Sequence, residues 1–223
     1  MPARLRRFAA IPLSLLLLTV VLGAAPRQAE AATSFAYDTF FSSAYERQVD
    51  SRTCVAASVA MMENINNGRD LNLNQHEILR YAQARDRLND ATQRGTDPLG
   101  WDRAAEHFSQ LTIRPTRYRW EAHPTEASAL RKAALQIARY GKAVGLLVQH
   151  GHHAVVMTGF TSTRNPLKGS FTVTGIWYSD PLGTSHRWVS AASSPLNTYL
   201  QTDATPTYDS YWYGKYIIVI PMT

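Results

Sequence analysis

Apolar residues in the first half of the chain recur at the spacing of three and four positions that is typical of one helix face. An alanine-rich apolar run predicts a buried helix from about Thr53 to Asn66, which Gly68 ends. Three more helices are expected: one after the capping box at Asn74, extending to about Asn89; one that opens at Asp97-Pro98; and one from Pro124 to Tyr140. Residues 32–47 and 111–120 have no clear period, and we expect them to be extended.

The second half of the chain changes to the β-branched and aromatic content that is typical of strands. Strands are expected at 144–149, 153–160, 170–179, 186–190 and 211–220. The sequence Asn165–Gly169 predicts a turn between the second and third of these. Helices followed by a run of strands indicate an α+β fold, in which N-terminal helices pack on a C-terminal antiparallel sheet.

The first 31 residues have the pattern of a secretory signal peptide, which is removed on export. The basic start consists of Arg4, Arg6 and Arg7, and the apolar run covers Phe8–Ala25. The small-x-small cleavage site is Ala29-Glu30-Ala31. The cleavage site and the break at Pro26 argue against the alternative, a retained membrane anchor. We therefore expect a secreted, extracellular protein that forms a single domain, residues 32–223, with no membrane attachment after cleavage.

The charge of the chain depends on whether this leader is counted. The full chain has 23 Lys+Arg and 17 Asp+Glu, a net charge of +6. The leader holds four arginines and one glutamate, which leaves 19 basic against 16 acidic residues, a net charge of +3. The basic balance therefore does not indicate a nucleic-acid partner. The remaining 192 residues suit one domain with a substantial core, and we expect a monomer.

Cys54 is the only cysteine of the chain, so it cannot form an internal disulfide. A free thiol outside the cell is open to oxidation, and a chain that keeps one has either buried it or uses it. Ser51 or Thr53 can cap the helix that begins here. Cys54 then lies in the first turn, where free N–H groups and the helix dipole favour a thiolate. The alternative is a small buried hydrophobe at the head of a core helix.

Two further stretches can complete a site around this thiol. His153 opens an apolar strand, and Asp180 ends the next one, directly before Pro181. If these strands are antiparallel neighbours, His153 lies beside Asp180, and a base meets the acid that orients it. The alternative for Asp180 is a turn residue at the end of a strand.

Three histidines close together, His150, His152 and His153, raise the alternative of a metal site. On a strand, His150 and His152 share one face and His153 points the other way. Two histidines on one face do not complete a zinc site, and the chain has no H-E-x-x-H motif. We therefore expect neither a metal nor another cofactor.

Gln48 six positions before Cys54, His153 in His-Ala-Val-Val-Met-Thr-Gly-Phe, and Asp180 in Ser-Asp-Pro occur in this order. This set resembles the papain-like cysteine peptidases, and most closely their secreted bacterial C39-like group. The resemblance implies the papain-like fold. It also selects His153 over His152, because the family histidine lies six positions before the glycine that corresponds to Gly159. One departure is that Val55-Ala56 follows the cysteine, where the C39-like group usually has Gly-Pro.

The resemblance implies that Cys54 attacks a peptide carbonyl, His153 transfers the proton, Asp180 orients the imidazole, and Gln48 donates to the oxyanion. We therefore expect a cysteine peptidase with peptide or protein substrates. Two alternatives stay open. One is a domain of this fold that has lost activity and serves as an exported binding module. The other is related acyl-transfer chemistry on the same triad, as in amidases and transglutaminases.

Overall fold

A computed structural model describes residues 34–87, 95–200 and 211–223. All of them fall within the unit Ala32–Thr223. The predicted signal peptide lies outside the described residues. In the part of the chain that the structure describes, no helix has the length and apolar character needed to span a bilayer.

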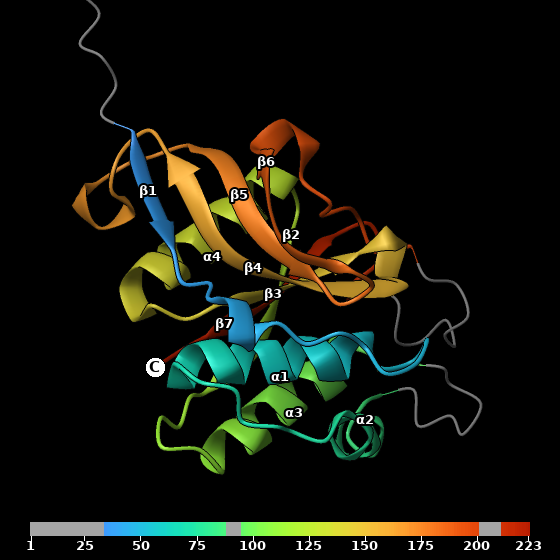
Figure 1. Cartoon of the computed structure of the whole chain (residues 1–223). Helices are drawn as coiled ribbons and strands as arrows, with labels where there is room; N and C mark the ends of the chain where they lie inside the picture. The colour runs from blue at the N-terminus through green and yellow to red at the C-terminus, as the bar shows by residue number, and fades with distance from the viewer. Residues whose placement is uncertain (1–33, 88–94, 201–210) are drawn as a thin grey trace, which may run out of the picture. The chain divides into compact units, whose positions relative to one another are not determined.

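Seven strands of the described chain form one antiparallel sheet (Figure 1). The path is β2 (Tyr118–His123), β7 (Tyr216–Pro221), β3 (Val144–Val148), β4 (His153–Ser162), β5 (Val173–Asp180) and β6 (Thr184–Ser190). β1 (Phe35–Asp38) pairs with the second half of β4, beyond the residues that β3 occupies. Every pairing is antiparallel, which confirms the predicted α+β class.

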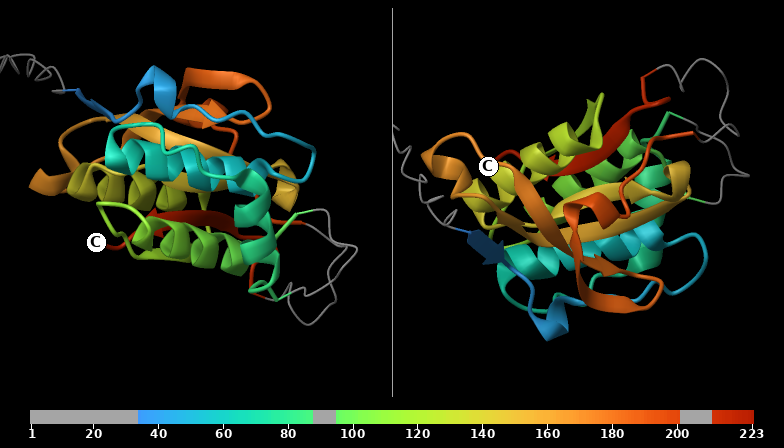
Figure 2. Two further views of the ribbon diagram at one scale, coloured as in Figure 1. Left: turned by 60° about the horizontal axis from the view of Figure 1, so that its bottom comes forward. Right: turned by 90° about the horizontal axis from the view of Figure 1, so that it is seen from above.

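Helices cover both faces of this sheet. The core on one face is shared by α1 (Cys54–Asn67), α2 (Gln75–Gln83) and α3 (Pro98–Gln110), and the core on the other face by α4 (Glu126–Tyr140). Seen from above in Figure 2, β4 runs between α1 and α4. The sequence pattern predicted helices against a sheet, and the structure adds that they divide between its two faces.

The central strand β4 is buried on both faces for this reason. Ala154 and Val156 lie in the core beside α1, whereas Val155 and Met157 lie in the core beside α4. A strand covered on both sides is apolar at every position, and its sequence does not show which face a given residue takes.

Several predicted boundaries move in the structure. The second helix ends at Gln83 rather than near Asn89, because its last turn tightens and Arg85 N–H donates to the Ala82 carbonyl over 2.9 Å. The fourth helix begins after Thr125 instead of at Pro124, since the Thr125 hydroxyl accepts from Ser128 N–H at 3.2 Å and so caps the helix. The last strand begins at Tyr216 instead of 211.

A buried polar cluster fixes the C-terminal end of α1. Glu63 has no exposed surface, and burial raises its pKa to about 7. The Asn66 amide donates to one Glu63 carboxylate oxygen at 3.4 Å. The Asn66 amide also donates to the Thr116 hydroxyl at 2.8 Å. The helix that begins at Cys54 is therefore tied at its far end to the segment before β2.

β1 lies against β4 at Gly159, where no side chain fits. Asp38 is the partner of Gly159 across the two strands. A Cβ at Gly159 would lie 2.5 Å from the Tyr37 carbonyl oxygen and 2.7 Å from the Asp38 Cα. Both atoms belong to the backbone, which cannot turn aside as a flexible side chain can.

Replacing this glycine tests the close approach of the two strands. Gly159→Ala is expected to lower the free energy of unfolding by about 1 to 3 kcal/mol, because the backbone of β1 must shift. Gly95→Ala is the matched control, since nothing lies within 4 Å of a Cβ there, and its effect is expected to stay below about 0.5 kcal/mol. Urea denaturation measures both variants, and equal midpoints would contradict the packing described here.

Candidate active site

His153 and Asp180 meet where β4 begins and β5 ends. His153 is the first residue of β4, and Asp180 is the last residue of β5. The two strands pair antiparallel, with Val156 opposite Ser179, as the sequence predicted. His153 Nε2 lies 2.7 Å from Asp180 Oδ1, and the histidine is only 4% exposed.

Cys54 reaches the same place from α1. It is the first residue of that helix, it is 9% exposed, and it lies close enough to His153 to raise the pKa of the imidazole. Because Asp180 occupies Nε2, Nδ1 is the ring nitrogen that remains for the thiol. The structure thus brings three of the four predicted site residues into one chain of contacts, in the order Cys54, His153, Asp180.

The predicted side-chain cap of α1 is wrong. Thr53 occupies the N-cap position, but its hydroxyl makes no capping bond to the helix. The hydroxyl instead donates to the Asp50 carbonyl and accepts from Asp50 N–H, both at 3.1 Å. Thr53 therefore leaves the N–H groups of the first turn free to bind a negative charge beside Cys54.

The pKa values of the pair favour its charged form. Burial by itself lowers the pKa of His153, but hydrogen bonds to Asp180 and Cys54 and the charges of both outweigh it and raise this pKa to about 9. Burial acts to raise the pKa of Asp180, yet the bonds from His153 and from Leu182 N–H outweigh it and lower that pKa. At neutral pH the site therefore holds an imidazolium next to a carboxylate.

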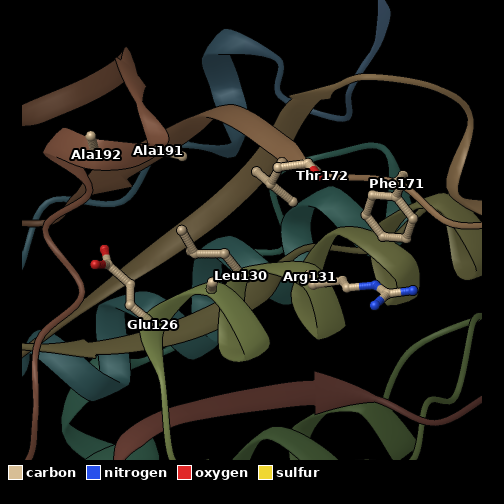
Figure 3. Close-up of a pocket in the computed structure, with 9 residues that line it drawn as sticks. Glu126, Leu130, Arg131, Phe171, Thr172, Ala191 and Ala192 are labelled. Carbon is tan, nitrogen blue, oxygen red and sulfur yellow. The ribbon is translucent and has the colours of Figure 1, made fainter.

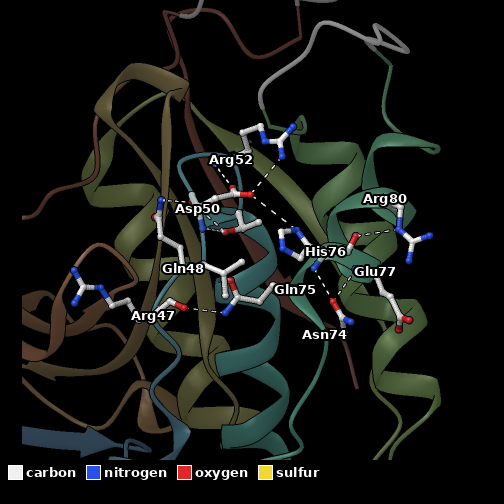
Figure 4. A network of polar contacts seen from close by, with 11 residues as sticks. Arg47, Gln48, Asp50, Arg52, Asn74, Gln75, His76, Glu77 and Arg80 are labelled. Carbon is white, nitrogen blue, oxygen red and sulfur yellow. Dashed lines mark hydrogen bonds and ion pairs between the residues drawn. The ribbon is translucent and has the colours of Figure 1, made fainter.

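Gln48 lies in the segment before α1. Its backbone N–H donates to the Pro181 carbonyl at 3.0 Å, directly after Asp180. Its amide Nε2 donates to the Asp50 carbonyl at 2.8 Å, while Oε1 is buried with no hydrogen-bond partner within the described ranges (Figure 4). One Nε2 hydrogen is engaged in this way, and the second remains to donate. Gln48 thus borders the turn after Asp180, and its oxyanion role stays a prediction.

The segment that precedes Cys54 is held by the start of α2. Gln75 accepts from Val49 N–H at 3.1 Å and donates to the Arg47 carbonyl at 2.8 Å. Asp50 accepts from Arg52 N–H at 2.8 Å and lies 3.9 Å from His76 (Figure 4). These bonds fix the path of the segment that leads to Cys54.

Tyr45 is a supporting residue that the sequence did not single out. Its hydroxyl donates to the Asp180 carbonyl at 3.1 Å. With the bond from Gln48 N–H to Pro181, this contact fastens the turn after β5 to the segment before α1. Nothing in the sequence marks Tyr45, because it is one of several aromatic residues in a stretch without periodicity.

The three neighbouring histidines do not share a strand, which corrects the prediction for His150 and His152. Residues Gln149–Gly151 form a short 3-10 turn, and His152 is exposed at its end. His150 instead bonds to residues 197 and 198. In the part of the chain that is described, no group of three or more His, Cys, Asp or Glu side chains is arranged to hold a metal ion.

A cavity of about 420 Å³ lies elsewhere, between the start of α4 and the segments that flank β5 and follow β6 (Figure 3). Its walls are largely apolar and include Leu130, Phe171 and Ala191. None of Cys54, His153 and Asp180 lines it. The cavity is therefore separate from the contacts of Cys54, His153 and Asp180.

Titration of His153 tests the electrostatics of the pair. In the wild type the imidazole is expected to titrate near pH 9, and in Asp180→Asn nearer to its ordinary value of about 6.5. Because folding raises the pKa of His153, protonation of this ring adds to the free energy of unfolding. The contribution is complete below about pH 6.5 and is lost as the pH rises through about 9. NMR follows the ring, and unfolding at pH 6 and pH 10 follows the stability. An imidazole that titrates at the same pH in both proteins would contradict the described contact.

The sequence matches no model of a known protein family, and a search of curated proteins gives no relative. A proposal for the function therefore rests on the sequence and on the geometry of the site.

Proposed function

We propose that this protein is a secreted cysteine peptidase of papain-like fold that hydrolyses peptide bonds in peptide or protein substrates. The observation that carries the proposal is the chain of contacts from Cys54 through His153 to Asp180. A thiol, an imidazole and a carboxylate in this order are the components of nucleophilic acyl transfer. The leader pattern of residues 1–31 supports export, and the single thiol of the chain is the one that the site employs.

The first half of the reaction forms a thioester. The Cys54 thiolate attacks the carbonyl carbon, and the electron pair of the C=O bond moves to the oxygen. Free N–H groups at the start of α1 and the second hydrogen of Gln48 Nε2 bind this oxyanion. As the C–N bond breaks, the His153 imidazolium gives its proton to the leaving amine nitrogen.

The second half restores the enzyme. Neutral His153 takes a proton from a water molecule, whose oxygen attacks the thioester carbon. The C–S bond breaks, the carboxylic acid leaves, and the thiolate and imidazolium are paired again. Asp180 accepts from His153 Nε2 in the charged state and stabilises the imidazolium each time that it forms.

The low exposure of Cys54 favours a second candidate, an exported binding module that has lost the activity. Amidase or transglutaminase-type chemistry uses the same thioester and differs only in the acyl donor or acceptor. Substrate profiling separates peptidase from amidase or transfer, and thiol reactivity separates all of them from an inactive module.

Cys54→Ser is expected to reduce hydrolysis of a peptide library by about 10³-fold or more, because the nucleophile is lost. The melting temperature is expected to stay close to that of the wild type. In the folded wild type, iodoacetamide is expected to alkylate Cys54 below about pH 7, since the thiol is paired with an imidazolium. Labelling that requires unfolding would support the inactive module, and full turnover in the variant would end the assignment of the nucleophile.

Comparing the two adjacent histidines tests which one is the base. His153→Ala is expected to lower kcat/KM by about 10² to 10⁴, because the general acid and base is removed. His152→Ala is expected to stay within about tenfold of the wild type, a barrier change of about 1.4 kcal/mol. Matched circular dichroism spectra control for folding. If His152→Ala is the inactive variant, the assignments of both His153 and Asp180 fail.

A further inference from the structure

The turn that presents His153 has an uncommon backbone. Gln149 and His150 have φ values of 50° and 56°, and Gly151 follows with a φ of 102°. Residues other than glycine seldom adopt this left-handed conformation, and two in succession persist only where the surroundings hold them. The turn closes when His152 N–H donates to the Gln149 carbonyl at 3.1 Å, and β4 begins at the next residue.

The surroundings hold this turn through His150. Its backbone N–H donates to Asn197 Oδ1 at 2.8 Å, and its carbonyl accepts from Leu200 N–H at 3.0 Å. Its ring Nδ1 lies 2.9 Å from the Thr198 carbonyl oxygen. A carbonyl oxygen only accepts, so Nδ1 carries the proton in this contact. Three polar groups of this one residue are thus bound to a segment almost fifty positions later in the chain.

The bonds to His150 have a consequence at His153, three residues further on. His153 pairs with Val148 across the hairpin, so the path of the turn sets where His153 begins the strand. Its ring has to reach Asp180 on one side and Cys54 on the other. A small displacement of a catalytic group costs a large factor in rate.

We propose that His150 is a positioning residue, which holds the left-handed turn so that the His153 ring contacts Asp180 and Cys54 together. The inference about turnover rests on the proposed function, whereas the inference about the His153 ring does not. His150 contacts no reacting group itself and acts through the backbone of the turn.

Two substitutions at this position separate the contributions. His150→Ala removes the ring nitrogen that bonds to Thr198 and places a residue that disfavours the left-handed region. His150→Asn keeps both features, because asparagine tolerates this conformation and its amide nitrogen takes the place of Nδ1. His152→Ala is the matched control: it alters the same turn at an exposed side chain that the proposal does not use.

The experiment measures the NMR titration of His153, kcat and KM on a peptide substrate, and the melting temperature of each purified full-length mature variant. In His150→Ala, the His153 titration is expected to fall by about one pH unit or more towards its ordinary value. The value of kcat is expected to fall about 10- to 100-fold with KM little changed, because the base is displaced. His150→Asn and His152→Ala are expected to retain the titration of the wild type.

A His150→Ala variant that keeps both the wild-type titration and kcat while only its melting temperature falls would overturn the proposal, since His150 would then be merely structural. If His150→Ala does not fold, Asn197→Ala removes only the acceptor of the His150 N–H, and an unchanged His153 titration there would overturn the proposal equally. A wild type without hydrolytic activity would end the proposed function, and the titration would still decide the role of His150.

Discussion

The hydrogen bond between His153 Nε2 and Asp180 Oδ1 is the interaction on which the site depends. His153 is almost fully buried, and burial alone favours a neutral imidazole. A carboxylate oxygen 2.7 Å away reverses this preference and keeps the ring charged well above neutral pH. The same bond fixes the orientation of the ring, so that its other nitrogen remains for Cys54. The hydrogen bond to Asp180 therefore accounts for both the charge and the orientation of the imidazole.

The rest of the fold keeps the two ends of this bond in place. Tyr45 and Gln48 fasten the turn after Asp180, and both belong to the segment that leads to Cys54. His150 holds the turn before His153. Cys54, His153 and Asp180 come from different elements, and a small number of hydrogen bonds near them couples their positions.

The helix that carries Cys54 is a rigid support. Every residue of α1 is buried, since α2 and α3 pack beside it and the sheet lies against it. Asn66 ties its far end to the segment before β2. A helix enclosed in this way cannot move away from the sheet without exposing the core, and the distance between the first turn of α1 and the start of β4 is fixed accordingly.

The sequence by itself determined the class of the fold and the pairing of β4 with β5. Helical and strand periods are local, and the turn at 165–169 requires the two strands around it to run antiparallel, which places residue 153 near residue 180. Alternation along β4 could not choose between His152 and His153. Extended by two residues, the pattern of Ala154 and Val156 would put His152, and not His153, on the side of α1. The strand instead begins at His153, because the left-handed turn at Gln149–Gly151 ends the alternation there. That turn is held by Asn197, Thr198 and Leu200. Contacts between residues so far apart in the chain leave no trace in a local pattern, so periodicity alone could not choose between His152 and His153. The family resemblance selected His153, and only the tertiary structure shows how its ring is held against Asp180.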